Sequence, residues 1–298
     1  MDVLADAPWL RPPLAAAEQQ LATGRLPHAL LLSGPAGWGQ DWLADALVRR
    51  LLDLDDSRAL KELAHPDLRQ VDPDGAMLKI EQVRRLGEFA TGTRQLAPAK
   101  VARLNRAHTL NPQAANALLK TLEEPSPDTY LLLVTEYPGR LLPTIRSRCQ
   151  QLTVRPDQAA ALQWLQRHCG AAPQTAALSF EYGGAPLAVL EAVREERQPL
   201  GPALLQALET RDPKPLLDAL LAAAPEEVLL RLLRYLVATQ ARTPAGLTAL
   251  ETVPRRALVA VQQELLFLHR GLLQSNSVNV SLQFERLAHR FVNLVQQV

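Results

Sequence analysis

The stretch HALLLSGPAGWGQD (28–41) constrains the fold of this chain more than any other stretch. It begins with an apolar run that ends in a glycine-rich loop. An amphipathic segment follows at residues 40–52, where Leu43, Leu47 and Leu51 recur every four positions. A short apolar run bounded by glycine is typical of a buried strand, and the four-residue spacing is typical of a helix. A strand, a loop and a helix in this order predict the opening of a βαβ unit.

The rest of the first half alternates between strand and helix patterns. Residues 111–125 show the clearest helix pattern, because Asn111 suits the N-cap and Pro112 suits the first helical position. The other candidate elements are strands at 99–105 and 129–136, and a short helical turn leading into a last strand at 143–154. This alternation predicts an α/β domain with a mostly parallel sheet that is covered on both faces.

From about residue 155 onwards the patterns are helical only. Aromatic residues make up 4% of the chain, so Leu and Ala have to fill much of the core, and both favour helices. We therefore predict three domains. They are an α/β domain at 1–154, a small helical domain at 155–197 and an all-α C-terminal domain at 198–298.

The glycine loop has the spacing of a phosphate-binding loop without its two reactive side chains. Gly34 and Gly39 fit the motif G-x-x-x-x-G-K-[ST], with Gly37 between them, but Gln40 and Asp41 stand where Lys and Ser or Thr belong. Gln40 brings no charge to a phosphate. The Asp41 carboxylate is expected to cap the following helix and to repel an anion. We expect little or no nucleotide binding, and the alternative is a glycine turn in a protein unrelated to nucleotides.

A second part of an ATPase site is also missing from the sequence. P-loop ATPases carry acidic residues at the end of a later strand, where they hold Mg²⁺ and polarise water. The corresponding residues here are Asn105 and Arg106, and neither is acidic. Two independent losses predict an ATPase fold without ATPase chemistry. Thr135, at the end of the apolar run 129–136, is then expected to be structural.

Charge and cysteine content narrow the class of protein. Lys and Arg number 32 against 31 for Asp and Glu, which argues against nucleic-acid binding through bulk charge and still allows a local basic patch. Cys149 and Cys169 are too few for a disulfide scaffold and suit a reducing cytoplasm. The first residues do not match a signal peptide, and no apolar stretch approaches the ~20 residues that span a bilayer. We expect a cytoplasmic protein without membrane contact.

Several segments together resemble bacterial clamp-loader subunits of the AAA+ class. They are PWLRP near the start, LPHALLLSGPAG, HPDL (65–68), NALLKTLEEP (116–125) and TIRSRCQ (144–150). At motif level the resemblance covers about the first half of the chain, and NALLKTLEEP followed by a strand and SRC is far more specific than the glycine loop. The resemblance implies an AAA+ P-loop domain of the α/β class, then a helical lid domain and a helical collar domain that joins the subunits.

Members of this family open a sliding clamp and place it on primed DNA within a DNA-directed DNA polymerase holoenzyme. The resemblance therefore implies gamma/tau-type ATPase subunits and a delta subunit as partners. It also implies contact with the sliding clamp and primer-template DNA through the complex. The chain is most similar to members with a degenerate loop that hydrolyse no ATP. The alternatives are an ATP-binding, gamma-type clamp-loader ATPase and a scaffold without a role in replication.

The Ser-Arg-Cys motif carries the arginine finger of the family, here Ser147, Arg148 and Cys149. A guanidinium can stabilise charge that develops on a γ-phosphate, including one bound by a neighbouring subunit. The resemblance thus implies that Arg148 acts in trans. The alternative is a surface arginine paired with Glu123 or Glu124. These two acids end a helix at the unfavourable end for anions, and we expect them at an interface.

The chain departs from the family in two places. Many relatives carry a four-cysteine zinc module, but residues 51–67 contain no cysteine, so we predict no zinc or other metal. ATP-using relatives place an arginine against the nucleotide where this chain has Leu187. DNA contact is a separate expectation. Arg84, Arg85 and Arg94 are candidates for phosphate contacts, with a solvated helix face as the alternative.

Overall fold

The computed structural model of the chain describes residues 6–55, 60, 63–75, 77–124, 126–170, 173–241, 250–251, 253–274 and 279–294. The chain divides into two compact units, Met1–Trp164 and Leu165–Val298. Each unit has a hydrophobic core of its own, and the two are described separately below.

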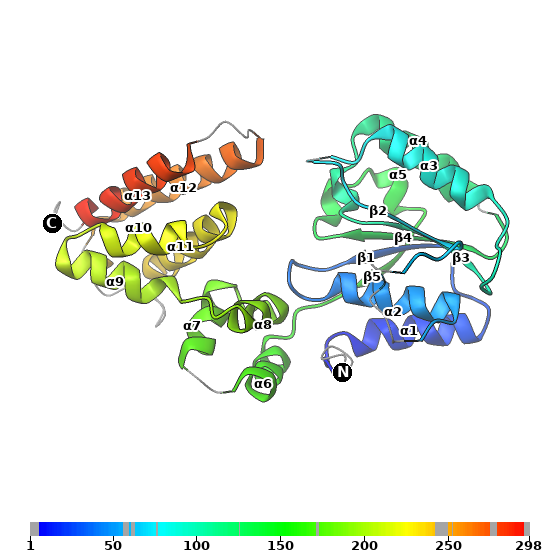
Figure 1. Ribbon diagram of the computed structural model, residues 1–298, viewed down its shortest axis with the longest axis horizontal. Helices are drawn as coiled ribbons and strands as arrows, with labels where there is room; N and C mark the ends of the chain where they lie inside the picture. The colour runs from blue at the N-terminus through cyan, green and yellow to red at the C-terminus, as the bar shows by residue number, and fades with distance from the viewer. Residues whose placement is uncertain are drawn as a thin grey trace. The chain divides into compact units, whose positions relative to one another are not determined.

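A parallel sheet forms the centre of the first unit (Figure 1). Its strands are β1 (Ala29–Ser33), β2 (Leu68–Val71), β3 (Lys100–Leu104), β4 (Thr129–Thr135) and β5 (Gln150–Thr153). They lie in the order β2-β3-β4-β1-β5, and every neighbouring pair is parallel. The inner strands β1 and β3 are buried along their whole length, as a sheet covered on both faces requires. The predicted parallel sheet is confirmed.

Helices cover both faces of this sheet (Figure 1). Helices α1 (Arg11–Ala22) and α2 (Gln40–Leu52) lie on one face, and α3 (Ile80–Thr91) and α4 (Pro112–Glu123) pack together on the other. Asn111 caps α4 as predicted, because its Oδ1 accepts a hydrogen bond of 2.8 Å from the backbone N–H of Ala114. The short elements η2 (Ala107–Thr109), η3 (Pro138–Arg140) and α5 (Pro143–Arg146) complete the unit.

The second unit contains only helices within its described residues. Helix α6 (Gln158–Cys169) crosses the boundary between the units. The others are α7 (Pro173–Glu181), α8 (Pro186–Arg194), α9 (Leu200–Thr210), α10 (Lys214–Leu221), α11 (Pro225–Gln240), α12 (Arg255–Gln274) and α13 (Val280–Leu294). The helical character predicted after residue 155 is confirmed. No helix in the part of the chain that the structure describes is long and apolar enough to cross a membrane.

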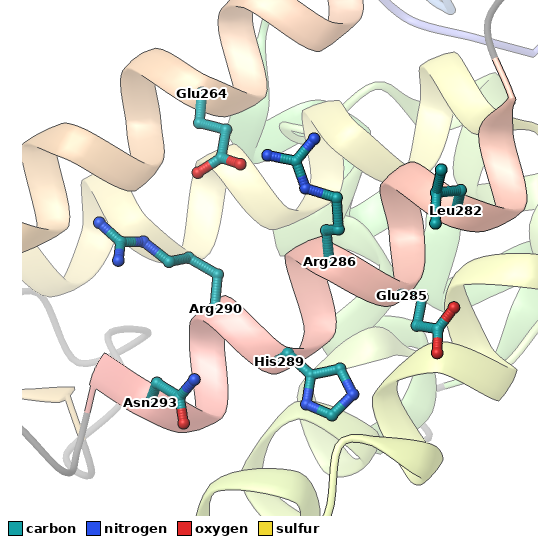
Figure 2. A pocket seen from close by; sticks show the side chains of 7 residues that line it. All are labelled: Glu264, Leu282, Glu285, Arg286, His289, Arg290 and Asn293. Atoms are coloured by element: carbon teal, nitrogen blue, oxygen red, sulfur yellow. The ribbon is translucent and has the colours of Figure 1, made fainter.

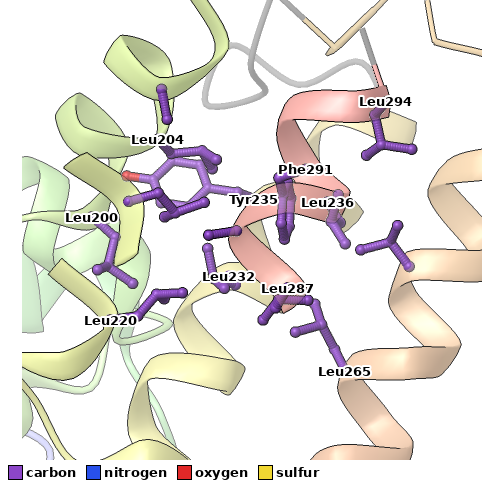
Figure 3. Close-up of a cluster of buried hydrophobic side chains, with 14 of the residues drawn as sticks. Leu200, Leu204, Leu220, Leu232, Tyr235, Leu236, Leu265, Leu287, Phe291 and Leu294 are labelled. Carbon is purple, nitrogen blue, oxygen red and sulfur yellow. The ribbon is translucent and has the colours of Figure 1, made fainter. Parts of the chain in front are cut away.

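Leucine stripes on α9 to α13 meet in one core (Figure 3). Leu204, Leu232, Leu265 and Phe291 come from four of these helices, and each is at most 1% exposed. Burying such side chains stabilises the fold by about 1.5–3 kcal/mol each. These leucine stripes therefore serve to build the core of the second unit.

Some of the apolar surface of α11 and α12 remains exposed. Val237 is 47% exposed and Phe267 is 79% exposed. The collar role predicted for residues 198–298 stays a prediction, as does the three-domain division. The predicted boundary at residues 197 and 198 lies inside the second unit, where α7 contacts α11 across it.

Candidate functional site

The glycine loop joins β1 to α2 at the carboxyl edge of the sheet. Gly37 and Gly39 have φ angles of 74° and 95°, in the left-handed region that favours glycine. A Cβ atom on Gly34 would lie 2.9 Å from the Cβ of Val154, so a larger residue there would push against the chain that leaves β5. The backbone itself requires all three glycines, without reference to a nucleotide.

The side chain of Gln40 points into the loop. It is 2% exposed, and its Oε1 makes no hydrogen bond with any described residue. An ideal Cβ on Gly34 would stand 3.5 Å from this oxygen, so the amide lies close under the loop backbone. A working phosphate loop carries its lysine at this position. This chain instead places a neutral amide there, which brings no positive charge to an anion.

The prediction that Asp41 caps α2 is wrong. The N-cap is Gly39, and no side chain makes a capping bond at that end of the helix. Asp41 Oδ1 accepts a hydrogen bond of 3.1 Å from Nη2 of Arg103 instead. The physical reason is burial. Arg103 is 4% exposed, and a buried charge without a counter-ion costs far more than an uncapped helix end.

Arg103 of β3 is the centre of a polar network beneath α2. Its Nη1 donates to Asp45, and its Nε donates to Oδ1 of Asn105 at 2.6 Å. Asn105 in turn donates from Nδ2 to Asp72 at 3.0 Å. With Asp41 included, all three nitrogens of the guanidinium have partners. The cation next to the loop is therefore already neutralised by carboxylates of the same chain.

The two positions at which an ATPase carries its acids, 105 and 106, supply no carboxylate in this chain. Asn105 is held inside the network, and Arg106 is exposed with a left-handed φ of 48°. Thr135 is buried, and its hydroxyl lies 3.0 Å from Nδ1 of His108 and accepts a bond from the backbone N–H of Tyr137. Burial, helped by the charge of Arg106, lowers the pKa of His108 to about 4. The structural role expected for Thr135 fits this geometry.

Three tryptophans fix the loop to its surroundings in the first unit. The ring of Trp9 meets those of Trp38 and Trp164 edge to face, with centroids 5.7 and 5.5 Å apart. Trp9 also donates from Nε1 to the backbone oxygen of Trp38 at 2.9 Å, and Trp164 donates to Asp6 at 2.8 Å. Trp38 belongs to the glycine loop and is 2% exposed. The PWLRP segment therefore holds the loop closed with apolar rings.

The Ser-Arg-Cys motif lies between α5 and β5. Arg148 forms an ion pair from Nη2 to Oε1 of Glu123 at 2.6 Å, and its Nη1 donates to the backbone oxygen of Thr144 at 3.0 Å. Ser147 donates to the same Thr144 oxygen at 3.1 Å. Cys149 is 8% exposed and belongs to the core, and burial raises the pKa of its thiol to about 11. The thiol is therefore a packing group.

The predicted loop and the predicted finger lie at opposite edges of the sheet. The loop follows the last residue of β1, Ser33, whereas Arg148 precedes the first residue of β5, Gln150. Because β1 and β5 are parallel neighbours, these two ends face opposite ways. A strand of this length spans about 15 Å. Within one chain, the structure therefore does not bring Arg148 to the glycine loop.

The other predicted site residues are scattered. Arg84 and Arg85 are exposed on α3, and Arg94 lies 3.5 Å from Asp128 as a surface ion pair. Leu187 lies half-buried on α8 of the second unit. Across the described residues, no group of three or more His, Cys, Asp or Glu side chains is placed to hold a metal ion. The absence of zinc stays a prediction.

An open hollow of about 540 Å³ lies between α12 and α13 of the second unit (Figure 2). Its lining residues are Glu264, Leu282, Glu285, Arg286, His289, Arg290 and Asn293. Figure 2 shows Arg286 and Arg290 on the side of α13 that faces Glu264. No predicted site residue lies here, and the mixture of acids and bases selects no class of ligand.

Several residues of the loop network were not predicted from the sequence. Arg103 had a visible signal, because an arginine inside the apolar run AKVARLN needs a buried partner. Asp45 and Asp72 had no such signal in the sequence, since their separation from Arg103 along the chain is large.

Glu136 follows β4 and is half-buried. Burial, together with the charge of Asp41, raises the pKa of its carboxyl.

Comparisons with known proteins show similarity to subunits of DNA polymerase III. The model of the family described as DNA polymerase III, delta subunit, matches residues 12–158. The chain is 42% identical over 193 residues to the DNA polymerase III subunit delta′ of Pseudomonas aeruginosa, covering 57% of this chain and 58% of that protein. It is 34% identical over 232 residues to the subunit delta′ of Escherichia coli K12, covering 72% of this chain and 70% of that protein.

The match thus spans less than two thirds of the Pseudomonas protein. A solved structure of a DNA polymerase III gamma subunit-related protein from Thermotoga maritima is similar with a TM-score of 0.54 and 17% identity. This likeness covers 96% of this chain and 99% of that one, and it shows the fold. The predicted fold class, an AAA+ α/β domain followed by helices, is confirmed.

Proposed function

This chain belongs to the family of DNA polymerase III delta′ subunits, and we propose that it acts as a non-catalytic subunit of the clamp loader. In this role it donates Arg148 in trans to a nucleotide held by a neighbouring ATPase subunit. The neighbour's ATP turnover then drives loading of the sliding clamp onto primed DNA. The chain contributes to the polymerase holoenzyme without hydrolysing ATP itself.

The observation that carries the proposal is the placement of Arg148 at the amino edge of the sheet. The glycine loop of the same chain lies at the carboxyl edge, about one strand length away. An arginine finger has to reach within hydrogen-bond distance of the γ-phosphate. Arg148 is therefore suited to a nucleotide on another subunit. Its side chain is 38% exposed, so it is accessible to one.

Three features of the loop support the absence of ATP chemistry on this chain. Gln40 occupies the place of the phosphate-binding lysine and is turned inwards. The N–H donors of Arg103 are already hydrogen-bonded to Asp41, Asp45 and Asn105. Trp38 is packed against Trp9. A nucleotide would have to displace these contacts without gaining a lysine or a magnesium ligand in return.

We propose gamma/tau-type ATPase subunits and a delta subunit as direct partners, and contact with the clamp and primer-template DNA through the complex. Glu123 is paired with Arg148, and Glu123 and Glu124 stand together at the end of α4. Their place fits the interface at which the finger would act. A cytoplasmic setting and the absence of bound zinc belong to the same proposal.

The test is a reconstituted clamp loader that contains the Arg148→Ala chain. Because an arginine finger in trans accelerates phosphoryl transfer by a large factor, we expect DNA-stimulated ATP hydrolysis to fall by about tenfold or more. Size-exclusion chromatography should show that the complex still assembles. The matched control is Arg25→Ala, another exposed arginine of the first unit, which should leave the rate unchanged. Unchanged hydrolysis with Arg148→Ala removes the finger assignment.

Titration of ATP into the chain alone separates this proposal from its alternative. We expect no heat of binding at nucleotide concentrations up to the millimolar range. An affinity in the micromolar range would identify a gamma-type ATP-binding subunit instead, since the retained glycine geometry is the one feature that favours that role.

A further inference from the structure

We infer that Glu123 is a positioning residue for Arg148, and that this is the reason an acid ends α4. The inference rests on the proposed function, since it assigns Glu123 a role only if Arg148 serves a neighbour's nucleotide. Its first observation is the ion pair itself, in which Nη2 of Arg148 lies 2.6 Å from Oε1 of Glu123.

Arg148 is held from two directions by two different elements. Glu123 is the last residue of α4, and Thr144, whose backbone oxygen accepts from Nη1 at 3.0 Å, belongs to α5. Both elements are anchored in the same core, because Leu122 is 2% exposed and Ile145 is 0% exposed. Two anchors on a rigid base restrict the rotamers of a long, flexible side chain.

These contacts orient the guanidinium of Arg148 and use only some of its N–H donors. Arginine has five N–H donors in a fixed plane. The two contacts of Arg148 use one hydrogen on each terminal nitrogen. Nε and the second hydrogen of each terminal nitrogen stay available for an anion that approaches from outside. A finger prepared in this way loses less conformational freedom when it meets a γ-phosphate.

Neither the helix dipole nor a gain in stability accounts for a glutamate at position 123. A carboxylate at a helix C-terminus faces the negative end of the helix dipole, which is unfavourable. The pair is exposed, with side-chain exposures of 38% for Arg148 and 50% for Glu123, and exposed pairs add little to stability. Glu124 follows directly, is exposed, and forms no ion pair with a described residue. The matched control of equal charge is Glu81, an exposed acid in the first turn of α3.

The experiment is a double-mutant cycle in the reconstituted clamp loader. Glu123→Ala should lower the kcat of DNA-stimulated ATP hydrolysis by about two- to fivefold, which is the range expected for losing one exposed ion pair. The KM for ATP should not change, because Glu123 does not touch the nucleotide. Glu123→Gln keeps an acceptor and should retain part of the lost rate. Glu81→Ala, which removes an exposed acid of α3 outside the proposed interface, should behave like the unmodified chain.

The cycle is closed with Arg148→Ala. In that background Glu123→Ala should have no further effect, since there is no side chain left to position. An equal effect in both backgrounds, a changed KM, or a faster rate with Glu123→Ala overturns the inference. If Arg148→Ala slows hydrolysis and Glu123→Ala does not, only the positioning role is wrong. If Arg148→Ala itself has no effect, the proposed function is wrong, and this inference with it.

Discussion

Asp67 gives the HPDL segment a structural role through the hydrogen bonds of its carboxylate. Its carboxylate is fully buried and accepts backbone hydrogen bonds from Gln95, Leu96 and Ala97 at 2.7, 2.7 and 2.9 Å. Burial alone would raise the pKa of this carboxyl, but the three N–H donors outweigh it and hold the pKa of Asp67 below its usual value. The residue thus ties the segment before β3 to the start of β2.

Asp67→Asn should destabilise the first unit by about 2–3 kcal/mol at pH 7, because an amide leaves part of this donor set unpaired. The lowered pKa sets the pH dependence. The unfolded chain takes up a proton more readily, so the stabilisation is complete above the ordinary carboxyl pKa of ~3.9 and is lost as the pH falls through the folded pKa. Urea unfolding should show a large difference from the wild type at pH 7 and a smaller one at pH 3.

Asp74→Asn is the matched control for that measurement. Asp74 pairs with Lys79 at 2.5 Å, but its side chain is 68% exposed, so water replaces the lost interaction. We expect no change in its urea midpoint. Equal midpoints for Asp67→Asn and the wild type at pH 7 would show that the buried carboxylate does not anchor the segment.

Single residues of the site were predictable only where a local rule governs them. Gly34, Gly37 and Gly39 follow from the shape of one short loop, so the sequence of that loop alone predicts them. Asp41 bonds to Arg103, which is 62 positions away along the chain. The other carboxylate partner of Arg103 on α2, Asp45, is 58 positions away from it. No pattern along the chain specifies such a pair. Pairing with a buried charge took precedence over helix capping at Asp41.

The same distinction holds for whole elements. The strands β1 and β4 and the helix α4 carry strong local signals, namely apolar runs and a capped, proline-started helix. β2 was not predicted, because LRQV at the edge of the sheet is only partly buried and has no apolar run. α1 was not predicted either. Its sequence RPPLAAAEQQLA buries only Ala17, so its apolar stripe is weak.

A buried ion pair joins two elements of the second unit. Glu181 ends α7 and is 0% exposed, and Arg231 of α11 is 1% exposed. Nε of Arg231 donates to Oε2 of Glu181 at 2.7 Å, while Oε1 accepts from the hydroxyl of Tyr235 at 2.6 Å and from the backbone N–H of Leu200 at 2.7 Å. The carboxylate therefore connects α7, α9 and α11. It links the segments that the sequence assigned to lid and collar.

Arg231→Met should lower the free energy of unfolding by about 3–5 kcal/mol, because it leaves the Glu181 carboxylate buried without its counter-ion. The double variant with Glu181→Gln should recover part of this loss, since a neutral amide still accepts from Tyr235. Arg256→Met, an exposed arginine on α12, is the control and should change little. Guanidinium unfolding followed by circular dichroism measures all three. A loss below about 1 kcal/mol for Arg231→Met would mean that the pair contributes no more than a surface salt bridge.

At the scale of the whole molecule, the described residues of each unit form hydrophobic clusters of their own. One cluster of the first unit is built from the sheet, α3 and α4, with Leu31, Leu104 and Leu133 among its buried residues. The core of the second unit is built from α9 to α13, with Leu232 and Phe291 among its members (Figure 3). Cooperative unfolding follows a shared core, so separate cores predict separate transitions.

Calorimetry of the full chain should therefore resolve two transitions. Asp67→Asn should lower only one of them and Arg231→Met only the other, because the two residues belong to different cores. The double variant should show both shifts unchanged, since the effects of residues that share no partners add within about 0.5 kcal/mol. If either variant lowers both transitions equally, the two units unfold as one cooperative body.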